Sequence, residues 1–271
     1  MTEPLKKFGS CTILAGCLIL AIVVTGCIGG REPGSTPARE TTPAVPAVTT
    51  VKPAPAETYP VQQVAGRIRI TGSSTVLPIA QKAADAYMEK NLKADILVSG
   101  GGSSVGVQAI GEGTADIGMS SREISDAEKA KYPGLVPIDI ATDAVVIIVN
   151  PANPVNALTM DQVRGLYNGT YQGWNSVGGT MTYPVTIGRD SASGTRVYFS
   201  EAVMKNEKYR SDMREMNSNG AVKQTVAQTP GAVGYVGLGY VDNTVKAVAI
   251  YKGGQPVKPS IETVLAHEYP I

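Results

Sequence analysis

Hydroxyl-bearing residues gather in a short stretch that also carries an arginine, Gly188 to Arg196. Within it, the small residues Ala192, Ser193 and Gly194 let the backbone turn and let a ligand approach its N–H groups. Ser193 can cap the helix that is predicted to follow, whose N-terminus offers free N–H donors and the positive end of a dipole. The guanidinium of Arg189 adds a planar set of donors suited to a tetrahedral oxyanion. The stretch therefore indicates an anion site, although an ordinary strand–turn–helix junction with a surface arginine has the same pattern.

Similar hydroxyl-rich segments occur at three further points along the chain. Ser73 to Thr75 follows a β-branched apolar run, and Ser103 and Ser104 follow three consecutive glycines. Ser120 and Ser121 end another short apolar run. Because ligands of α/β sheets bind at the carboxyl ends of strands, where loops meet helix N-termini, we expect these segments to converge. Many neutral donors around one arginine suit a small dehydrated oxyanion, which pairs them all.

Hydrophobic periodicity predicts alternating strands and helices from residue 64 to the C-terminus. The predicted strands cover residues 64–70, 94–98, 115–119, 136–140, 144–149, 183–187, 231–237 and 245–251. The predicted helices cover residues 76–90, 107–111, 126–131, 160–167, 197–204, part of 206–219, 221–228 and 260–266. Residues 169–179 are predicted to form a loop. This alternation implies an α/β fold with mostly parallel sheets.

Composition limits the kinds of site that the folded part can contain. The chain has 271 residues and a net charge of +1, which indicates no nucleic-acid partner. The three cysteines, Cys11, Cys17 and Cys27, lie near the N-terminus, and the single histidine is His267. The folded part therefore offers no disulfide, thiol nucleophile or histidine-based triad, and we expect neither a metal site nor a cofactor.

The first 26 residues have the pattern of an export signal. Two lysines form a basic start, no charged residue lies between Gly9 and Gly30, and Ile13 to Val24 is strongly apolar. Val24-Thr25-Gly26-Cys27 resembles a lipobox, in which cleavage before Cys27 leaves a lipid-bearing cysteine. An uncleaved membrane anchor is the alternative, because the uncharged run is long enough for a bilayer, which needs roughly 20 residues. Either interpretation places the rest of the chain outside the cytoplasm, tethered to the cell membrane.

Residues 27–64 are rich in proline, threonine and alanine, and they have few large apolar side chains. Such a segment cannot bury enough surface to fold, and its prolines make it extended and semi-stiff. We therefore expect residues 27–64 to form a lipid-tethered linker and the folded part to begin near residue 65.

Several of these motifs together resemble the ligand loops of the phosphate-binding proteins of ABC-type phosphate importers, the PstS-like family. The matching segments are Gly72 to Val76, Gly101 to Gly106, Asp116 to Arg122, Asn168 to Gly179, Arg189 to Arg196 and Gly234 to Asp242. They occur in the family's order, so the resemblance extends from Arg67 to the end of the chain. It implies a type II periplasmic-binding fold with two α/β lobes, two crossover strands and an anion in the cleft between them. Lobe 1 would comprise residues 65–143 plus 241–271, and lobe 2 residues 144–240.

The resemblance also implies a set of phosphate ligands and a function. By position, the ligand residues would be Ser74, Thr75, Val76, Ser103, Ser121, Arg189, Ser193, Gly194 and Thr195. The implied function is that of a monomeric, non-enzymatic binding protein. It would capture inorganic phosphate and deliver it to the permease subunits of an ABC transporter.

One position departs from the family pattern. Many members have an acidic residue where this chain has Ser121, and that residue accepts the proton of hydrogen phosphate. Such an acceptor rejects fully ionised sulfate, because facing lone pairs leave polar groups unpaired at about 1–3 kcal/mol or more. Ser121 can accept or donate, so it discriminates less. Asp190, Asp143 or Glu123 could supply the acceptor, or Asp190 could instead orient a neighbouring arginine.

Three other functions fit parts of the sequence. A binding protein for sulfate, molybdate or tungstate would use the same loops, and competition binding at several pH values would distinguish these ligands. A serine hydrolase or phosphatase using Ser193 or Ser74 would need a nearby base, but the chain has one terminal histidine and no Gly-x-Ser-x-Gly elbow. A structural cell-surface protein fits the tether but does not explain four polar strand ends.

Overall fold

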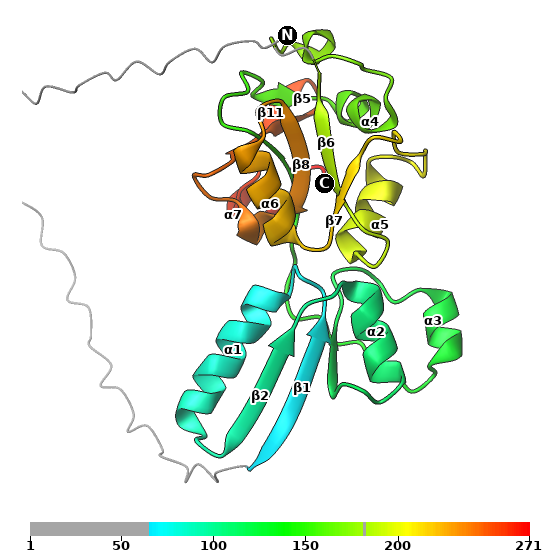
Figure 1. Ribbon diagram of the computed structural model, residues 1–271, viewed down its shortest axis with the longest axis vertical. Helices are drawn as coiled ribbons and strands as arrows, with labels where there is room; N and C mark the ends of the chain where they lie inside the picture. Colours follow the sequence, from blue (N-terminus) through cyan, green and yellow to red (C-terminus); the bar gives the residue numbers. More distant parts are fainter. Residues whose placement is uncertain (1–64, 181–182) are drawn as a thin grey trace, which may run out of the picture. The chain divides into compact units, whose positions relative to one another are not determined.

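The computed structural model describes residues 65–180 and 183–271 (Figure 1). The predicted signal segment, Cys27 and the linker over residues 27–64 lie outside the described residues. No helix within the described ranges is long and apolar enough to cross a membrane.

Strands and helices alternate along most of the described chain, as the periodicity predicts. The strands are β1 (Gly66–Gly72), β2 (Ala94–Ser99), β3 (Ile117–Met119), β4 (Val145–Val149), β5 (Ala157–Leu158), β6 (Val185–Arg189), β7 (Arg214–Met216), β8 (Ala232–Gly237), β9 (Lys246–Ala247), β10 (Ala249–Lys252) and β11 (Gln255–Val257). The helices are α1 (Leu77–Lys90), α2 (Ser103–Gly111), α3 (Asp126–Lys131), α4 (Met160–Asn168), α5 (Gly194–Ala202), α6 (Asn219–Gln228) and α7 (Ile261–Leu265), with 3₁₀ turns η1 (Trp174–Val177) and η2 (Leu238–Tyr240).

The first three strands form a parallel sheet in the order β2-β1-β3 (Figure 1). The connections through α1 and α2 run in opposite directions across this sheet, so right-handed crossovers place the two helices on opposite faces. Two glycines allow α2 to approach the strands closely. A Cβ on Gly106 would lie 2.5 Å from the backbone oxygen of Met119, and one on Gly72 would lie 2.8 Å from the Cα of Gly106. The loop before α2 is therefore held directly beside the end of β1.

The predicted strand over residues 136–140 is wrong. Val136, Ile138 and Ile140 lie in an irregular segment and are 81%, 79% and 65% exposed. A β-branched, apolar pattern favours an extended backbone, but a strand also needs a neighbouring backbone for its hydrogen bonds. Among the described residues no strand pairs with this segment, and Pro137 has no N–H to donate.

Residues 144–271 form a mixed sheet in the order β7-β6-β8-β4-β9 and a smaller sheet, β11-β10-β5. Strand β4 is buried along its whole length and pairs antiparallel with β8. Its side chains alternate between two hydrophobic clusters, as the two-residue period of a strand requires. Ile147 and Val149 pack in the cluster that contains Trp174, whereas Val146 and Ile148 pack in the cluster that contains residues of α6. The sheet is thus covered on both faces, which explains the continuous apolar run of β4.

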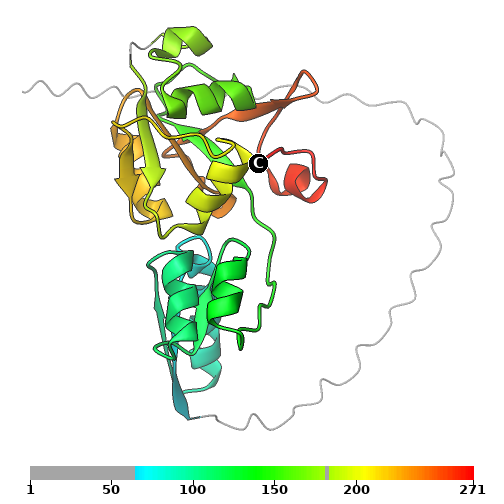
Figure 2. The same ribbon diagram turned by 90° about the vertical axis from the view of Figure 1, so that its right-hand side faces the viewer.

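The prediction that residues 241–271 belong to lobe 1 is also wrong. Strand β9 pairs with β4, and β10 pairs with β5, so both join the sheets of the second half (Figure 2). Tyr269 and Ile271 are buried in the same cluster as Trp174. The sequence pattern identifies these strands but carries no information on their partners. We therefore use lobe 1 for residues 65–143 and lobe 2 for residues 144–271, with the backbone passing from one to the other near Asp143.

Some of the remaining local predictions are confirmed, and others differ from the structure in small ways. Helices α3 and α4 are confirmed, and Thr159 forms a capping box with Gln162. Ser218 caps α6, in place of the predicted Asn219 or Gly220. The polar stretch 206–219, predicted to be partly helical, contains β7 and turns, because pairing with β6 decides the conformation there.

Candidate functional site

The junction between β6 and α5 has the predicted strand–loop–helix form. Arg189 is the last residue of β6, and α5 begins at Gly194. The Ser193 side chain accepts the backbone N–H of Arg196 at 3.2 Å, which confirms the predicted cap. Within the described residues, no hydrogen bond uses the backbone N–H of Gly194 or Thr195. These free donors, at the positive end of the helix dipole, are suited to an anion.

Arg189 is buried without a carboxylate partner among the described residues. Its side chain is 1% exposed, and none of the salt bridges between described residues involves it. Its Nε donates to the Met216 carbonyl at 3.1 Å, and Nη2 donates to the Asn217 carbonyl at 3.3 Å. Burial lowers the pKa of this guanidinium, partly offset by the charge of Asp190. A buried cation held only by carbonyl groups is stabilised when an anion joins it.

Loops of lobe 1 meet the start of α5 through hydroxyl groups. The Thr75 and Thr195 Oγ1 atoms are 3.0 Å apart, at hydrogen-bond distance. The Ser103 Oγ accepts the backbone N–H of Ser121 at 3.0 Å and lies 3.3 Å from the Ser121 Oγ. A Cβ on Gly194 would lie 2.3 Å from the Ser103 Oγ and 2.9 Å from the Ser121 Oγ. Four loops that are far apart in sequence therefore converge, as the sequence predicts, and we call them the hydroxyl cluster.

Two further predicted residues flank this cluster at the start of α1. Ser74 is 3% exposed, and its backbone carbonyl accepts the Tyr240 hydroxyl. Val76 precedes the first residue of α1, and no hydrogen bond among the described residues uses its N–H. The Val76 N–H is thus a further free helix-terminal donor, at the start of α1 beside Thr75.

Asn219 is part of this arrangement, and sequence reasoning did not identify it as a site residue. Its side chain is fully buried, and its Nδ2 donates to the Ser74 Oγ at 3.1 Å and to the Thr75 Oγ1 at 2.9 Å. Its Oδ1 accepts the Gly237 N–H at 3.2 Å. Asn219 therefore orients two hydroxyls of lobe 1 from the first turn of α6 in lobe 2. The only sequence signal was its position at a helix start, which suggested a cap.

The hydroxyls of Ser193 and Ser74 lack the partner that a nucleophile needs. Ser193 Oγ accepts a backbone N–H, and Ser74 Oγ accepts the Asn219 amide. Neither donor can remove a proton from a serine hydroxyl. His267 lies near the C-terminal end and donates its backbone N–H to Val264 in the last helical turn.

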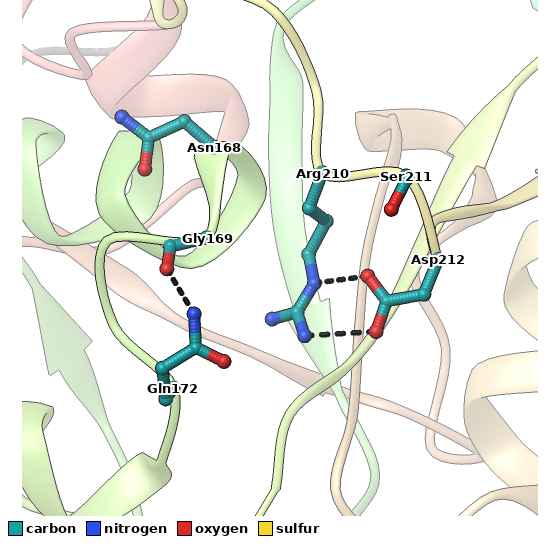
Figure 3. Close-up of a pocket in the computed structure, with 6 residues that line it drawn as sticks. All are labelled: Asn168, Gly169, Gln172, Arg210, Ser211 and Asp212. Atoms are coloured by element: carbon teal, nitrogen blue, oxygen red, sulfur yellow. Dashed lines mark hydrogen bonds and ion pairs between the residues drawn. The ribbon is translucent and has the colours of Figure 1, made fainter.

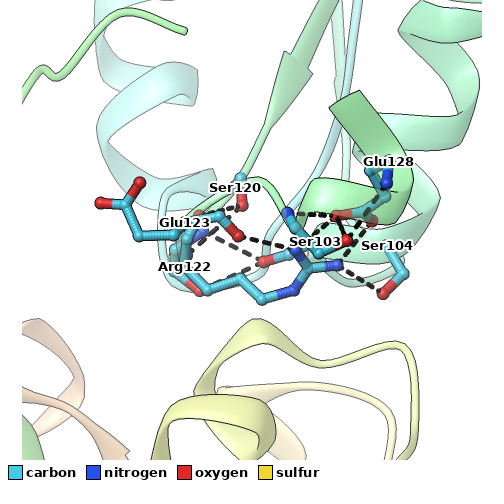
Figure 4. A network of polar contacts seen from close by, with 8 residues as sticks. Ser103, Ser104, Ser120, Arg122, Glu123 and Glu128 are labelled. Carbon is cyan, nitrogen blue, oxygen red and sulfur yellow. Dashed lines mark hydrogen bonds and ion pairs between the residues drawn. The ribbon is translucent and has the colours of Figure 1, made fainter. Parts of the chain in front are cut away.

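A second arginine near the cluster is neutralised within lobe 1. Arg122 donates from both terminal nitrogens to the Glu128 carboxylate, at 2.8 and 2.7 Å, and from Nη2 to the Ser104 Oγ at 3.1 Å (Figure 4). These bonds lower the pKa of Glu128 to about 2. The Ser120 hydroxyl donates to the Arg122 carbonyl at 2.7 Å, which fixes the loop that carries Ser121. Arg122 thus forms a structural ion pair with Glu128, whereas Arg189 has no carboxylate partner among the described residues.

A surface cavity of about 470 Å³ lies elsewhere on lobe 2 (Figure 3). It is lined by Asn168, Gly169, Gln172, Arg210, Ser211 and Asp212. The Arg210 guanidinium is paired with the Asp212 carboxylate, with Nη2 to Oδ2 at 2.9 Å. This cavity contains none of the predicted ligand residues. The described residues also contain no group of three or more histidine, cysteine or acidic side chains that could hold a metal ion.

Comparisons with known proteins agree with this geometry. A family model described as a PBP superfamily domain matches residues 54–271. The chain is 32% identical over 211 residues to the phosphate-binding protein PstS of Bacillus subtilis (strain 168), covering 78% of this chain and 69% of that protein. It is also 32% identical over 249 residues to the phosphate-binding protein PstS of Pseudomonas aeruginosa (strain UCBPP-PA14), covering 84% of this chain and 76% of that protein.

Solved structures of similar proteins have the same fold. One is a phosphate ABC transporter substrate-binding protein from Clostridium perfringens with bound phosphate, with a TM-score of 0.71, 32% identity and coverage of 76% of this chain and 83% of that one. Another is an ABC-type phosphate transport receptor from Vibrio cholerae, with a TM-score of 0.56, 29% identity and the same coverages, 76% and 83%. The chain has the α/β, type II periplasmic-binding fold and belongs to the PBP superfamily and, within it, to the PstS-like family of phosphate-binding proteins.

Proposed function

We propose that this protein captures inorganic phosphate outside the cytoplasm and delivers it to an ABC importer. The observation that carries the proposal is Arg189, a buried guanidinium that forms no salt bridge within the described residues. It ends β6, directly before the loop that leads to the free N-terminal donors of α5. One guanidinium surrounded by neutral donors matches a small, doubly charged oxyanion. The names of the relatives that are 32% identical support phosphate as that ion.

The predicted residues would take different roles around the ion. Arg189 supplies the charge, and the N–H groups of Val76, Gly194 and Thr195 supply backbone donors. The hydroxyls of Thr75, Ser103, Ser121 and Thr195 donate from both lobes. Ser193 holds the α5 terminus in place, and Ser74, bonded to Asn219, holds the loop before α1. The proposed ligand set is Ser74, Thr75, Val76, Ser103, Ser121, Arg189, Ser193, Gly194 and Thr195.

The phosphate would couple binding to closure of the two lobes. The Thr75–Thr195 contact and the approach of Ser103 to Gly194 both join lobe 1 to lobe 2. An ion bound between these groups satisfies donors of both lobes at once, so it favours the closed form over the open one. The permease would then recognise the closed form.

We also propose that the protein is monomeric, has no enzymatic activity and is tethered to the membrane. The serine hydroxyls of the cluster are bonded to donors rather than to a base, which supports binding without turnover. Tethering rests on the export signal and the lipobox, with Cys27 as the lipid-bearing residue or the apolar run as an uncleaved anchor. Mass spectrometry of the purified chain distinguishes these: loss of residues 1–26 with an added lipid mass supports Cys27, and an intact N-terminus supports the anchor.

Isothermal titration of the phosphate-depleted protein tests the proposed function. We expect one phosphate bound per chain and no release of product from a generic phosphoester. Sulfate, molybdate and tungstate are titrated in parallel, because Ser121 can donate as well as accept a hydrogen bond and therefore does not exclude these ions. If one of them binds and phosphate does not, that ion replaces phosphate as the ligand; if none binds, the proposed function is wrong.

A further inference from the structure

A hydroxyl group can hold a phosphate ion only when its hydrogen points at the ion. Apart from one proton, the phosphate oxygens are acceptors, whereas a threonine hydroxyl carries one donor hydrogen and two acceptor lone pairs. A hydroxyl that turns a lone pair toward the ion leaves two acceptors facing each other, which weakens binding. The direction of each hydroxyl in the cluster therefore matters as much as its position.

The side-chain amide of Asn219 has its orientation fixed by a backbone group. The Gly237 N–H can only donate, and it lies 3.2 Å from the amide oxygen, Oδ1. The amide oxygen must therefore face Gly237, at the end of β8, and Nδ2 must face lobe 1. Both hydrogens of Nδ2 then have an acceptor, the Ser74 Oγ at 3.1 Å and the Thr75 Oγ1 at 2.9 Å. Asn219 is fully buried, so bulk water does not compete for these bonds.

These bonds decide which way the Thr75 hydroxyl points. Because its oxygen accepts an Asn219 hydrogen, its own hydrogen is directed away from Asn219, and the Thr195 Oγ1 lies 3.0 Å away on the other side. The result is a chain of hydrogen bonds that starts at the Gly237 N–H and cannot reverse. The end of this chain is a donor, whether Thr75 or Thr195 supplies it, and the bonds along such a chain strengthen one another.

We propose that Asn219 is a positioning residue for phosphate, because its amide makes the hydroxyls of Thr75 and Thr195 donors toward the ion. This inference rests on the proposed function, since it assigns a further residue to the same site. Asn219 belongs to lobe 2 and Thr75 to lobe 1, so the direction is imposed only when the lobes are together. Closure therefore brings the hydroxyls to the ion and also sets them as donors.

Two structural roles that would explain a buried asparagine at this position belong to other residues. Ser218, and not Asn219, caps α6, because its side chain accepts a backbone N–H of the first turn at 3.2 Å. The loop before α1 has backbone bonds of its own, from the Ser73 N–H to the Met119 carbonyl at 2.9 Å and from the Leu77 N–H to the Ser73 carbonyl at 3.0 Å. Loss of the Asn219 amide should thus change the direction of the hydroxyls more than the position of the loop.

A double-mutant cycle, measured by isothermal titration of the full-length protein with inorganic phosphate, tests the proposal. Asn219→Ala should weaken phosphate affinity by about 5- to 150-fold, the range expected for one misdirected hydrogen bond in a buried site. In the Thr75→Val protein the hydroxyl that Asn219 directs is already absent, so Asn219→Ala should weaken affinity further by less than about threefold. A purely structural role of Asn219 would give the same loss in both backgrounds.

Asn150→Ala is the matched control. Asn150 is also buried in lobe 2, and its Oδ1 accepts the backbone N–H of Ala152 at 3.0 Å. Its Nδ2 donates to the carbonyls of Val226 and Ala227 at 3.1 and 2.9 Å, so it bonds in the same way as Asn219 but to no hydroxyl of the cluster. Its loss should lower the melting temperature, because buried carbonyls are left unpaired, and it should leave phosphate affinity within about threefold.

Two further variants keep the test decisive. Asn219→Leu removes the same donors but retains the buried volume, so it replaces Asn219→Ala in the cycle if the alanine variant does not fold. Thr75→Ser retains a hydroxyl that the amide can direct. In that background Asn219→Ala should again weaken phosphate affinity by about 5- to 150-fold.

Separate results overturn the inference and the proposed function. If the unaltered protein binds phosphate but Asn219→Ala changes the affinity by less than about threefold, or by the same factor with and without the Thr75 hydroxyl, Asn219 has no positioning role and phosphate binding stands. An equal loss of affinity in Asn150→Ala would also overturn the inference, since general destabilisation would then explain both variants. If the unaltered protein binds no phosphate, the proposed function itself fails.

Discussion

Replacing Arg189 by methionine should strongly weaken phosphate binding without unfolding the protein. Methionine retains most of the length and apolar volume of the arginine stem, which is 1% exposed, but it removes the charge and the guanidinium donors. Two charge-assisted hydrogen bonds to an anion contribute about 1.5–3 kcal/mol each. Their loss corresponds to a decrease in phosphate affinity of roughly 10²- to 10⁴-fold.

The same substitution has two opposing effects on the stability of the ligand-free protein. It leaves the carbonyls of Met216 and Asn217 without their Arg189 donors, which destabilises the fold. It also removes a buried cation that forms no salt bridge among the described residues, which stabilises the fold. Because these effects oppose each other, we expect the ligand-free melting temperature to change little. This expectation separates a binding role from a structural one.

Thermal unfolding with and without phosphate measures both effects in one experiment. At a phosphate concentration of 100 times Kd, binding adds about 2.7 kcal/mol, or roughly 5–11 °C for a domain of this size. With affinity lowered roughly 10²- to 10⁴-fold, the Arg189→Met protein should shift by no more than about 2 °C at that concentration. The matched control is Arg210→Met, since Arg210 is also largely buried but pairs with Asp212 in the cavity of Figure 3. A full phosphate-induced shift in Arg189→Met, or its loss in Arg210→Met, would contradict the reasoning.

Three further predictions concern packing and pH. Gly106→Ala would place a Cβ 2.5 Å from a backbone oxygen of β3, so the free energy of unfolding in urea should fall by about 1–3 kcal/mol or more; an unchanged midpoint would refute the close approach. Trp174→Phe removes the donor that holds the Gly231 carbonyl at 2.8 Å and should cost about 1–3 kcal/mol by circular dichroism, with a loss below 0.5 kcal/mol as the contrary result. The pKa of Glu128 is about 2 beside Arg122, against an ordinary value of 4.5, so this pair stabilises the fold fully above pH 4.5 and is lost as the pH falls toward 2. Glu128→Gln should therefore lower the melting temperature at pH 7 but not near pH 2, and an equal decrease at both pH values would exclude the ion pair as the cause.

The sequence predicts the local elements and the convergence of the site well, because both depend on short-range chemistry. Ser193 caps α5, Thr159 caps α4, and hydroxyl groups end β1 and β3 where parallel strands bring them to one edge. Thr75 and Thr195 are 120 residues apart in sequence, yet they meet because each lies at a strand–helix junction. Residue type and the period of the pattern are sufficient for these inferences.

The parts that could not be predicted depend on which segments become neighbours. Asn219 reaches Ser74 across 145 residues, and no local motif marks that contact. Residues 246–252 form strands as predicted, but pairing with β4 and β5 places them in lobe 2. Residues 136–140 have a strand-like pattern, but the described residues provide no pairing strand. In each case a long-range contact, which the periodicity does not encode, decides the outcome.

A crystal structure of the protein grown with phosphate tests the central claim most directly. We predict one tetrahedral ion within hydrogen-bond distance of Arg189, the Gly194 N–H and the hydroxyls of Thr75 and Ser103. An ion bound instead in the cavity beside Arg210, with Arg189 still bonded only to the carbonyls of Met216 and Asn217, would contradict it.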